Sequence, residues 1–265
     1  MVQFLTRRIS EKVDSMIAPS TKIETLLKGY KIQCPVSVIP SGIDLEKYAA
    51  QSQTDARERI RRKYGISKET TVLLYVGRLA KEKNVEELLE YQQKVQESGT
   101  MLMIAGGGPH LETLRKKAAE LGVMESVIFT GMVSPEEVAS YYPVGDLFVS
   151  ASTSETQGLT YAEALAAGLP LLCRKDECLR AVVEEGKCGW QYRTEEEFLK
   201  DLKNWKEKDE DERRGMCSYA KQSAEIFSQK RFAESVEQLY QRQLEEKRTE
   251  REKHLAKGNQ YCILG

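Results

Sequence analysis

Short apolar runs alternate with longer amphipathic stretches through most of the chain. The runs are rich in Val, Ile and Leu, and most lack the alternation of apolar and polar residues that a half-exposed strand shows. Such continuous runs are typical of parallel strands that are covered on both faces. They predict strands at residues 15–18, 36–39, 72–76, 101–105, 127–130, 147–150 and 169–173.

The stretches between these runs have apolar residues at helical spacing. They predict helices at residues 85–96, 111–121, 135–142 and 159–167. Glycine follows several of them, at Gly99, Gly122 and Gly168, as is common where a helix ends. The alternation of strands and helices predicts an α/β fold with a Rossmann-like, doubly wound parallel sheet.

From Glu195 onward the chain becomes strongly charged, and its pattern predicts helices. A stripe of Leu, Phe and Tyr lies between the charged positions. Surface helices that pack this stripe on the sheet are one interpretation. A helix that crosses to a partner domain is the other.

Polar and glycine-rich motifs follow four of the predicted strands. They are GRLAKEKN after residue 76, GGGPH after residue 105, GMVSPEE after residue 130 and ASTSETQG after residue 150. In a doubly wound sheet, ligands bind in the crevice beyond the carboxyl ends of the strands. We therefore expect these four loops to line one crevice.

Two of these loops carry groups suited to an anion. Arg78 offers a planar fork of donors and Lys83 a mobile point charge, which together would neutralise a diphosphate without a metal. The glycines at 106–108 let the backbone approach a phosphate or a sugar closely. Each feature also has a plainer explanation, namely surface cations near Glu82 and a tight turn after a strand.

The stretch SETQGLTYAEALAAGLP places Glu155 and Glu163 around the start of a predicted helix. A helix that begins near Leu159 directs its free N–H groups and the positive end of its dipole toward the crevice, and Gly158 permits close approach. Either acid alone could complement the dipole. Beside a bound diphosphate, however, both acids would have to face neutral hydroxyl groups, as carboxylates do with sugars. The pattern predicts a nucleotide-sugar site, with the diphosphate between the sugar and the ribose.

Composition and charge argue against several other classes of protein. The chain is 40% hydrophobic and 31% charged, and its formal net charge is −1, which gives no general attraction to nucleic acid. With no signal peptide and no apolar run that could span a bilayer, we expect a cytoplasmic protein. The basic segment ARERIRRKYG, residues 56–65, is either a solvated helix or a membrane-facing patch that would place the protein peripherally on a membrane. The six cysteines form no CxxC pair and predict reduced thiols and no metal site.

These motifs resemble the C-terminal, donor-binding domain of the family-4 retaining glycosyltransferases. That family has the GT-B fold of two facing Rossmann-like domains. The resemblance is carried by VDSMIAPS, VIPSGIDLEKY, GRLAKEKN, IAGGGP, IFTGMVSPEEV and SETQGLTYAEALAAGLP, and it extends from about residue 13 to Tyr192.

The resemblance implies a role for each candidate residue. Glu155 would hold hydroxyl groups of the donor hexose near the reacting carbon, and Glu163 would bind the ribose. Arg78 and Lys83 would contact the diphosphate and stabilise the departing nucleotide, so that the implied catalytic residues are Glu155, Arg78 and Lys83. Further donor-contacting positions are Gly77, Gly107 and Gly108, the base-packing loop Thr130, Gly131, Met132 and Val133, and the backbone amides around Gln157, Gly158 and Leu159.

SETQGLTYAEALAAGLP and RKDECLRAVVEEGKCGW are most similar to bacterial 1,2-diacylglycerol 3-glucosyltransferases. This similarity implies transfer of glucose from UDP-glucose to an acceptor hydroxyl, such as that of a diacylglycerol lipid, with retention at the anomeric carbon and without a cofactor or metal. Another donor, such as UDP-N-acetylglucosamine or GDP-mannose, or a non-catalytic binding module, remains an alternative.

Members of the family place an acceptor domain before the segment that matches VDSMIAPS. The resemblance therefore implies that residues 1–35 are the end of an N-terminal acceptor domain and a linker, that 36–194 bind the nucleotide sugar, and that 195–265 pack on that domain and could reach the other. The separate chain is expected to bind its donor weakly and to transfer little.

Overall fold

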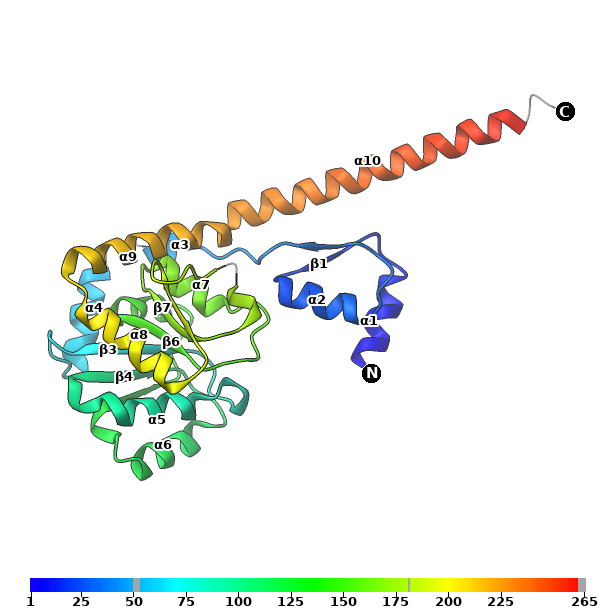
Figure 1. The fold of residues 1–265 in the computed structure, drawn as a ribbon. Helices are drawn as coiled ribbons and strands as arrows, with labels where there is room; N and C mark the ends of the chain where they lie inside the picture. The colour runs from blue at the N-terminus through cyan, green and yellow to red at the C-terminus, as the bar shows by residue number, and fades with distance from the viewer. Residues whose placement is uncertain (50–52, 181, 262–265) are drawn as a thin grey trace. The chain divides into compact units, whose positions relative to one another are not determined.

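The computed structural model describes residues 1–49, 53–180 and 182–261, and it divides the chain into two compact units (Figure 1). The sheet unit is Ile43–Ser228, and the terminal unit combines Met1–Gly42 with Gln229–Gly265. These limits differ from those inferred from the sequence, which fall after residues 35 and 194. The C-terminal helices are thus shared between the two units.

Six parallel strands form the sheet of the sheet unit, in the order β5-β4-β3-β6-β7-β8. The chain builds outward from β3 to β5, returns to the middle, and builds outward again from β6 to β8. This reversal makes the boundary between the two central strands, β3 and β6, the topological switch point. The strands are β3 (Thr71–Val76), β4 (Thr100–Ala105), β5 (Val127–Gly131), β6 (Leu147–Ser150), β7 (Leu171–Arg174) and β8 (Gly189–Tyr192).

Two hydrophobic clusters cover the two faces of this sheet. Along β3, Val72, Leu74 and Val76 belong to one cluster, and Leu73 and Tyr75 belong to the other. The apolar strand runs are therefore buried on both faces, as predicted. The covering helices are α3 (Leu45–Ala49), α4 (Gln53–Lys63), α5 (Val85–Val95), α6 (Leu111–Glu120), α7 (Leu159–Ala166), α8 (Glu195–Glu207) and α9 (Glu210–Ser223).

The five strand predictions for the sheet are confirmed within one or two residues, but one strand was missed and one helix prediction is wrong. The run predicted at 169–173 begins as strand only at Leu171, and β8 was missed because GWQY is short and contains a polar residue. The helix predicted at 135–142 is wrong. Val138–Ser140 of that segment forms a single 3₁₀ turn, and a second 3₁₀ turn, Tyr142–Val144, begins at its last residue and includes Pro143, which lacks the N–H group that an α-helix needs.

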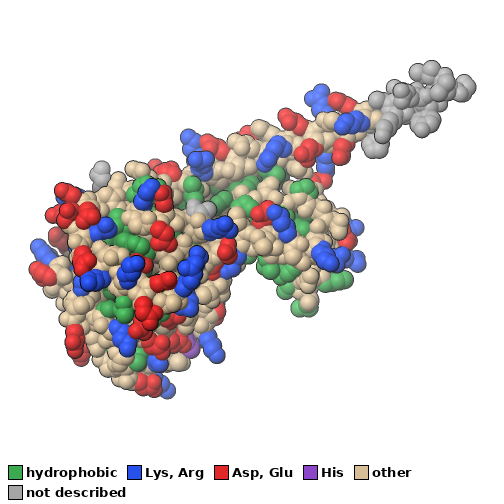
Figure 2. All heavy atoms as spheres, in the orientation of Figure 1, with side chains coloured by type: hydrophobic (Ala, Val, Ile, Leu, Met, Phe, Trp, Pro, Cys, Tyr) green, Lys and Arg blue, Asp and Glu red, His purple; other side chains and the backbone are tan. Residues whose placement is uncertain are grey.

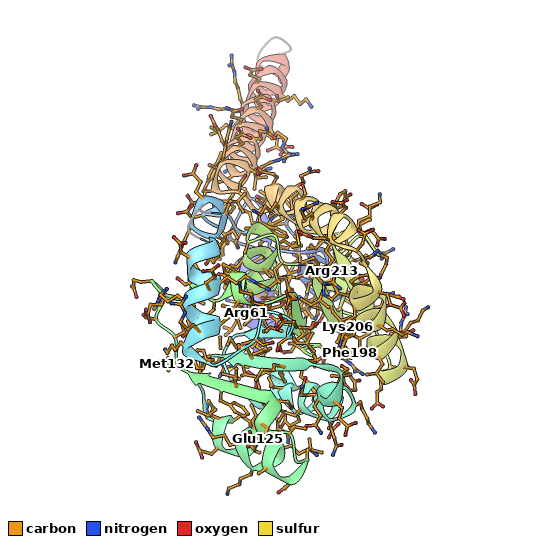
Figure 3. All side chains as sticks on the ribbon, turned by 90° about the vertical axis from the view of Figure 1, so that its left-hand side faces the viewer. Arg61, Glu125, Met132, Phe198, Lys206 and Arg213 are labelled. Carbon is orange, nitrogen blue, oxygen red and sulfur yellow. The ribbon has the colours of Figure 1, made fainter. Side chains whose placement is uncertain are left out.

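The basic helix α4 is not solvated along its whole length, because one of its arginines is buried within the sheet unit. Arg61 is 6% exposed, and its guanidinium donates to the carbonyl oxygens of Val144, Ser67 and Thr70 (Figure 3). Arg57 donates to Asp146 at 2.8 Å, and Asp146 accepts from the N–H of Val72 at 2.7 Å. The segment is a helix, as the solvated-helix interpretation expected, but Arg61 is buried instead of solvated.

The terminal unit contains α1 (Val2–Ser10), α2 (Thr21–Gly29), α10 (Gln229–Tyr261), and a parallel pair of strands, β1 (Met16–Ala18) and β2 (Val36–Val38). The strands predicted at 15–18 and 36–39 are thus confirmed. Helix α1 exposes apolar side chains, and acidic and basic side chains are interspersed along α10 (Figure 2). Among the described residues, no helix is both long and apolar enough to cross a membrane.

Candidate functional site

The loops after β3 and β6 meet at the switch point, where β3 pairs with β6 at Leu73–Leu147 and Leu74–Phe148. The Lys83 ammonium lies 2.6 Å from a Glu155 carboxylate oxygen, and these side chains are only 22% and 15% exposed. The Ser154 hydroxyl also donates to the carbonyl of Glu82 at 3.2 Å. The structure therefore brings together two candidates that are 72 residues apart in the chain.

Arg78 comes from the same loop as Lys83 but contacts a different partner. Its guanidinium pairs with the Glu82 carboxylate, and its side chain is 64% exposed. The Tyr75 hydroxyl donates to the Arg78 carbonyl at 3.2 Å, which holds the backbone at the start of the loop. The contact of Arg78 with a diphosphate stays a prediction.

Close backbone packing requires two of the three consecutive glycines after β4. A Cβ atom at Gly106 would lie 2.0 Å from the Gly77 carbonyl oxygen, and one at Gly108 would lie 2.3 Å from the Leu79 carbonyl oxygen. The N–H of Leu79 donates to Gly107 at 2.9 Å. These glycines therefore let the loops after β3 and β4 touch, which is sufficient to explain them without a ligand.

Gly158 precedes the first turn of α7 at the carboxyl end of β6. Its φ is +73°, and a Cβ atom there would lie 2.3 Å from the Tyr161 ring. Gly158 is the N-cap residue and has no side chain of its own to cap this end of α7, where the N–H groups of the first turn form the positive end of the helix dipole. Leu159 at that turn is half-exposed, and Gln157 before it is buried.

Glu163 lies one turn into α7 and contacts a buried tyrosine. The Tyr142 hydroxyl donates to its carboxylate. Burial, followed by the nearby Glu163 charge, raises the pKa of Tyr142 well above its ordinary value. The Glu163 carboxylate therefore accepts a hydrogen bond from the buried Tyr142 hydroxyl. Its contact with a ribose stays a prediction.

The base-packing candidates lie at the end of β5. Gly131 accepts from the N–H of Gly106 at 3.1 Å, so this loop is joined to the glycine loop after β4. The Thr130 hydroxyl donates to the Gly131 carbonyl at 2.9 Å, and Val133 packs against the core. Met132 is 85% exposed at the edge of the unit (Figure 3). The packing of a base on this loop stays a prediction.

Sequence reasoning missed a polar network beneath the Lys83 loop. Arg174, at the end of β7, contacts the Glu87 carboxylate at 2.7 Å, and the Asn84 amide donates to the same carboxylate at 2.9 Å. Asn84 joins the loop to α5 with φ at +51°. The network thus fixes the backbone directly after Lys83, and the arginine directly after an apolar strand was its sequence signal.

Within the residues that the structure describes, no group of three or more His, Cys, Asp or Glu side chains is placed to hold a metal ion. The five described cysteines are free thiols, and Cys262 lies outside the described residues. Action without a metal remains a prediction.

The fold and the motif-bearing loops have a counterpart in a known family. The sequence model of one protein family, described as glycosyl transferases group 1, matches residues 56–223, which is more than half of the chain. The chain belongs to this family, and the family resemblance predicted from the sequence is confirmed.

Curated relatives include two proteins named alpha-monoglucosyldiacylglycerol synthase. That of Streptococcus pneumoniae is 39% identical over 195 residues, which cover 72% of this chain and 44% of the relative. That of Acholeplasma laidlawii is 34% identical over 231 residues, which cover 84% and 57%. A third relative, the GDP-mannose-dependent alpha-(1-6)-phosphatidylinositol monomannoside mannosyltransferase of Mycolicibacterium smegmatis, is 30% identical over 200 residues, which cover 71% and 48%. The chain spans about half the length of these curated relatives.

Among solved structures, the chain is similar to Anabaena Alr3699/HepE in complex with UDP and glucose. The TM-score is 0.79 at 18% sequence identity, and the match covers 91% of this chain and 67% of that chain. At this identity the likeness bears on the fold. The predicted Rossmann-like half of a GT-B fold is confirmed.

Proposed function

We propose that this chain is the donor-binding half of a retaining hexosyltransferase that uses UDP-glucose. The observation that carries the proposal is the Lys83–Glu155 pair at the switch point, because Glu155 lies in the loop that leads into α7 at its glycine N-cap, Gly158. One loop contributes a cation for the pyrophosphate and the other an acceptor for sugar hydroxyls. The names of the two synthases support glucose as the sugar and a diacylglycerol-type lipid as the acceptor.

In the proposed reaction, the bond between the anomeric carbon and the oxygen of the nucleotide's β-phosphate breaks, a bond from that carbon to the acceptor oxygen forms, and the proton of the acceptor hydroxyl passes to the departing diphosphate. Negative charge develops on the departing diphosphate. Lys83, Arg78 and the N–H groups at Gly158 and Leu159 would stabilise that charge as preorganised electrostatics. Glu155 would orient the hexose hydroxyls so that the reacting carbon is presented to the acceptor. No protein nucleophile and no metal is required in this scheme.

The chain covers about half the length of its curated relatives, so the proposed role is that of the donor-binding part of such an enzyme. A second Rossmann-like domain would bring the acceptor to the donor. We expect the 265-residue chain to bind UDP-glucose weakly and to transfer little glucose without that domain.

The experiment is isothermal titration of the 265-residue chain with UDP and UDP-glucose, for the wild type and Glu155→Gln. Loss of a charged acceptor weakens a hydrogen bond by enough to lower UDP-glucose affinity about tenfold or more. Affinity for UDP itself should stay within about twofold, because UDP lacks the hexose. Glu112→Gln, a change at an exposed position on α6, is the matched control and should alter neither.

Equal losses for UDP and UDP-glucose in Glu155→Gln would contradict the division of roles. GDP-mannose is the second candidate donor, because a mannosyltransferase that depends on it is among the relatives. Tighter binding of GDP than of UDP in the same titration would contradict UDP-glucose as the donor and favour GDP-mannose.

A further inference from the structure

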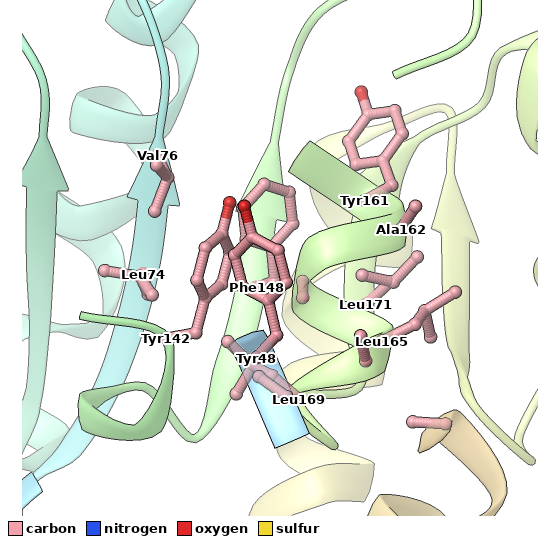
Figure 4. Packing of buried hydrophobic residues seen from close by; sticks show 14 of the residues in the cluster. Tyr48, Leu74, Val76, Tyr142, Phe148, Tyr161, Ala162, Leu165, Leu169 and Leu171 are labelled. Carbon is pink, nitrogen blue, oxygen red and sulfur yellow. The ribbon is translucent and has the colours of Figure 1, made fainter. Parts of the chain in front are cut away.

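Two tyrosine hydroxyls from separate segments converge on Glu163. Tyr48 lies on α3, and Tyr142 lies in the 3₁₀ turn before β6. The Tyr142 hydroxyl donates to one Glu163 carboxylate oxygen, and the Tyr48 hydroxyl also hydrogen-bonds to this carboxylate. Figure 4 shows the two hydroxyls side by side, both pointing toward the carboxyl ends of the strands. That is the end of the sheet where the candidate site lies.

Both tyrosine rings are buried and closely packed. Tyr142 is 0% and Tyr48 6% exposed, and their ring centroids are 5.6 Å apart in an edge-to-face arrangement. Tyr142 also stacks on Phe148, with centroids 6.2 Å apart. Burying a phenol hydroxyl costs free energy unless it finds a partner, so phenylalanine would fill this space at lower cost. The hydroxyls therefore serve a partner, and that partner is Glu163.

Both tyrosines are donors throughout the working range of pH. Burial, followed by the Glu163 carboxylate, raises the pKa of Tyr48 and of Tyr142. The phenols thus stay protonated, and Glu163 must accept from both. A carboxylate has about four acceptor positions, so about two remain for a ligand. With two positions bound to fixed rings, the direction of the remaining ones is fixed too.

We propose that Tyr48 and Tyr142 are positioning residues that hold the Glu163 carboxylate in the orientation that receives the vicinal hydroxyls of the nucleotide's ribose. The inference rests on the proposed function, in which Glu163 binds the ribose. The two tyrosines would touch no ligand themselves, and they would act through Glu163 to make the site prefer ribose over deoxyribose. Without either hydroxyl, the carboxylate can rotate and its preference for the diol falls.

The test measures affinity of the 265-residue chain for UDP and for 2′-deoxy-UDP by isothermal titration. The wild type should prefer UDP by about tenfold or more, since a hydrogen bond to a charged group is lost with the 2′-hydroxyl. Tyr48→Phe and Tyr142→Phe should each lower that ratio by about threefold or more, chiefly by weakening UDP binding. Affinity for 2′-deoxy-UDP should change less in the same variants.

Tyr161→Phe is the matched control. Tyr161 lies on the same helix as Glu163, is equally buried at 1% exposure, and donates instead to the Ser150 hydroxyl at 3.0 Å. Its variant also loses one buried hydroxyl, so the ratio of UDP to 2′-deoxy-UDP affinity should stay at the wild-type value. A second measurement uses Glu163→Gln as background, in which Tyr48→Phe should change the ratio no further.

The outcomes separate the inference from the function on which it rests. A lower ratio in both tyrosine variants, with Tyr161→Phe unchanged, supports the inference. Equal weakening of both nucleotides, with the ratio unchanged, overturns it and leaves the donor site intact, because the tyrosines would then act on the fold alone. If the wild-type chain bound neither nucleotide, the proposed function would fail and the inference with it.

Discussion

Replacing Arg61 with methionine should destabilise the sheet unit strongly, although the change removes one cation from a very basic helix. The Arg61 guanidinium donates to Val144 at 3.1 Å and to Ser67 at 3.0 Å, and it lies 3.6 Å from Asp146. Burial, and next the neighbouring Arg57 charge, lowers the pKa of Arg61. Arginine nevertheless stays charged at neutral pH, so the buried group is a cation held by acceptors.

The size of the effect follows from these contacts. Removing one partner from a buried ionic network costs about 3–5 kcal/mol, because the remaining acceptors lose their donors. Two features place Arg61→Met near the lower limit, at about 3 kcal/mol: methionine keeps the apolar stem, and Arg61 Nε has no hydrogen-bond partner among the described residues. With a slope of about 2 kcal/mol per molar urea, the unfolding midpoint should fall by about 1.5 M.

Tryptophan fluorescence is the right assay, because the chain has two tryptophans and both are buried in the sheet unit. Trp190 is in β8 and Trp205 is in α8, so their emission follows unfolding of this unit. Arg62→Met is the control, because Arg62 is exposed on the same helix and should shift the midpoint by less than about 0.25 M. Equal small shifts of the midpoint in the two variants would refute the reasoning, because the Arg61 contacts would then contribute no more to stability than an exposed arginine does.

Two further substitutions, each with a comparison variant, test the glycine loop and the candidate site. Gly106→Ala should lower the stability of the sheet unit by about 3 kcal/mol in urea unfolding, because its Cβ would lie 2.0 Å from the Gly77 carbonyl oxygen. Gly215→Ala should instead raise stability by up to about 1 kcal/mol in the same assay, because that glycine is inside α9 with open space around it. Lys83→Met should weaken UDP binding about tenfold or more, measured by titration, because the pyrophosphate loses a cation. Lys81→Met, an exposed change in the same loop, should leave UDP affinity unchanged; a similar loss there would indicate general charge attraction instead of a site.

The periodicity of the sequence determined the strands of the sheet and the loops that carry the site. Parallel strands buried on both faces must be apolar at nearly every position, so their pattern is visible locally. The loops after β3 and β6 were also foreseeable, because glycines and charges directly after such strands fall at the carboxyl ends. Shorter or polar elements such as Gly189–Tyr192 escaped, since four residues carry little periodicity.

Only the tertiary structure decided which side chains meet. The contact between Lys83 and Glu155 depends on β3 and β6 being neighbours, and the burial of Arg61 depends on the carbonyl groups that α4 meets. The tyrosines on Glu163 come from two segments that look unrelated in sequence. Local pattern reflects whether a residue is buried, because burial is repeated along an element. The partner of a buried polar group is set by how elements distant in the chain pack together, and no local pattern records that.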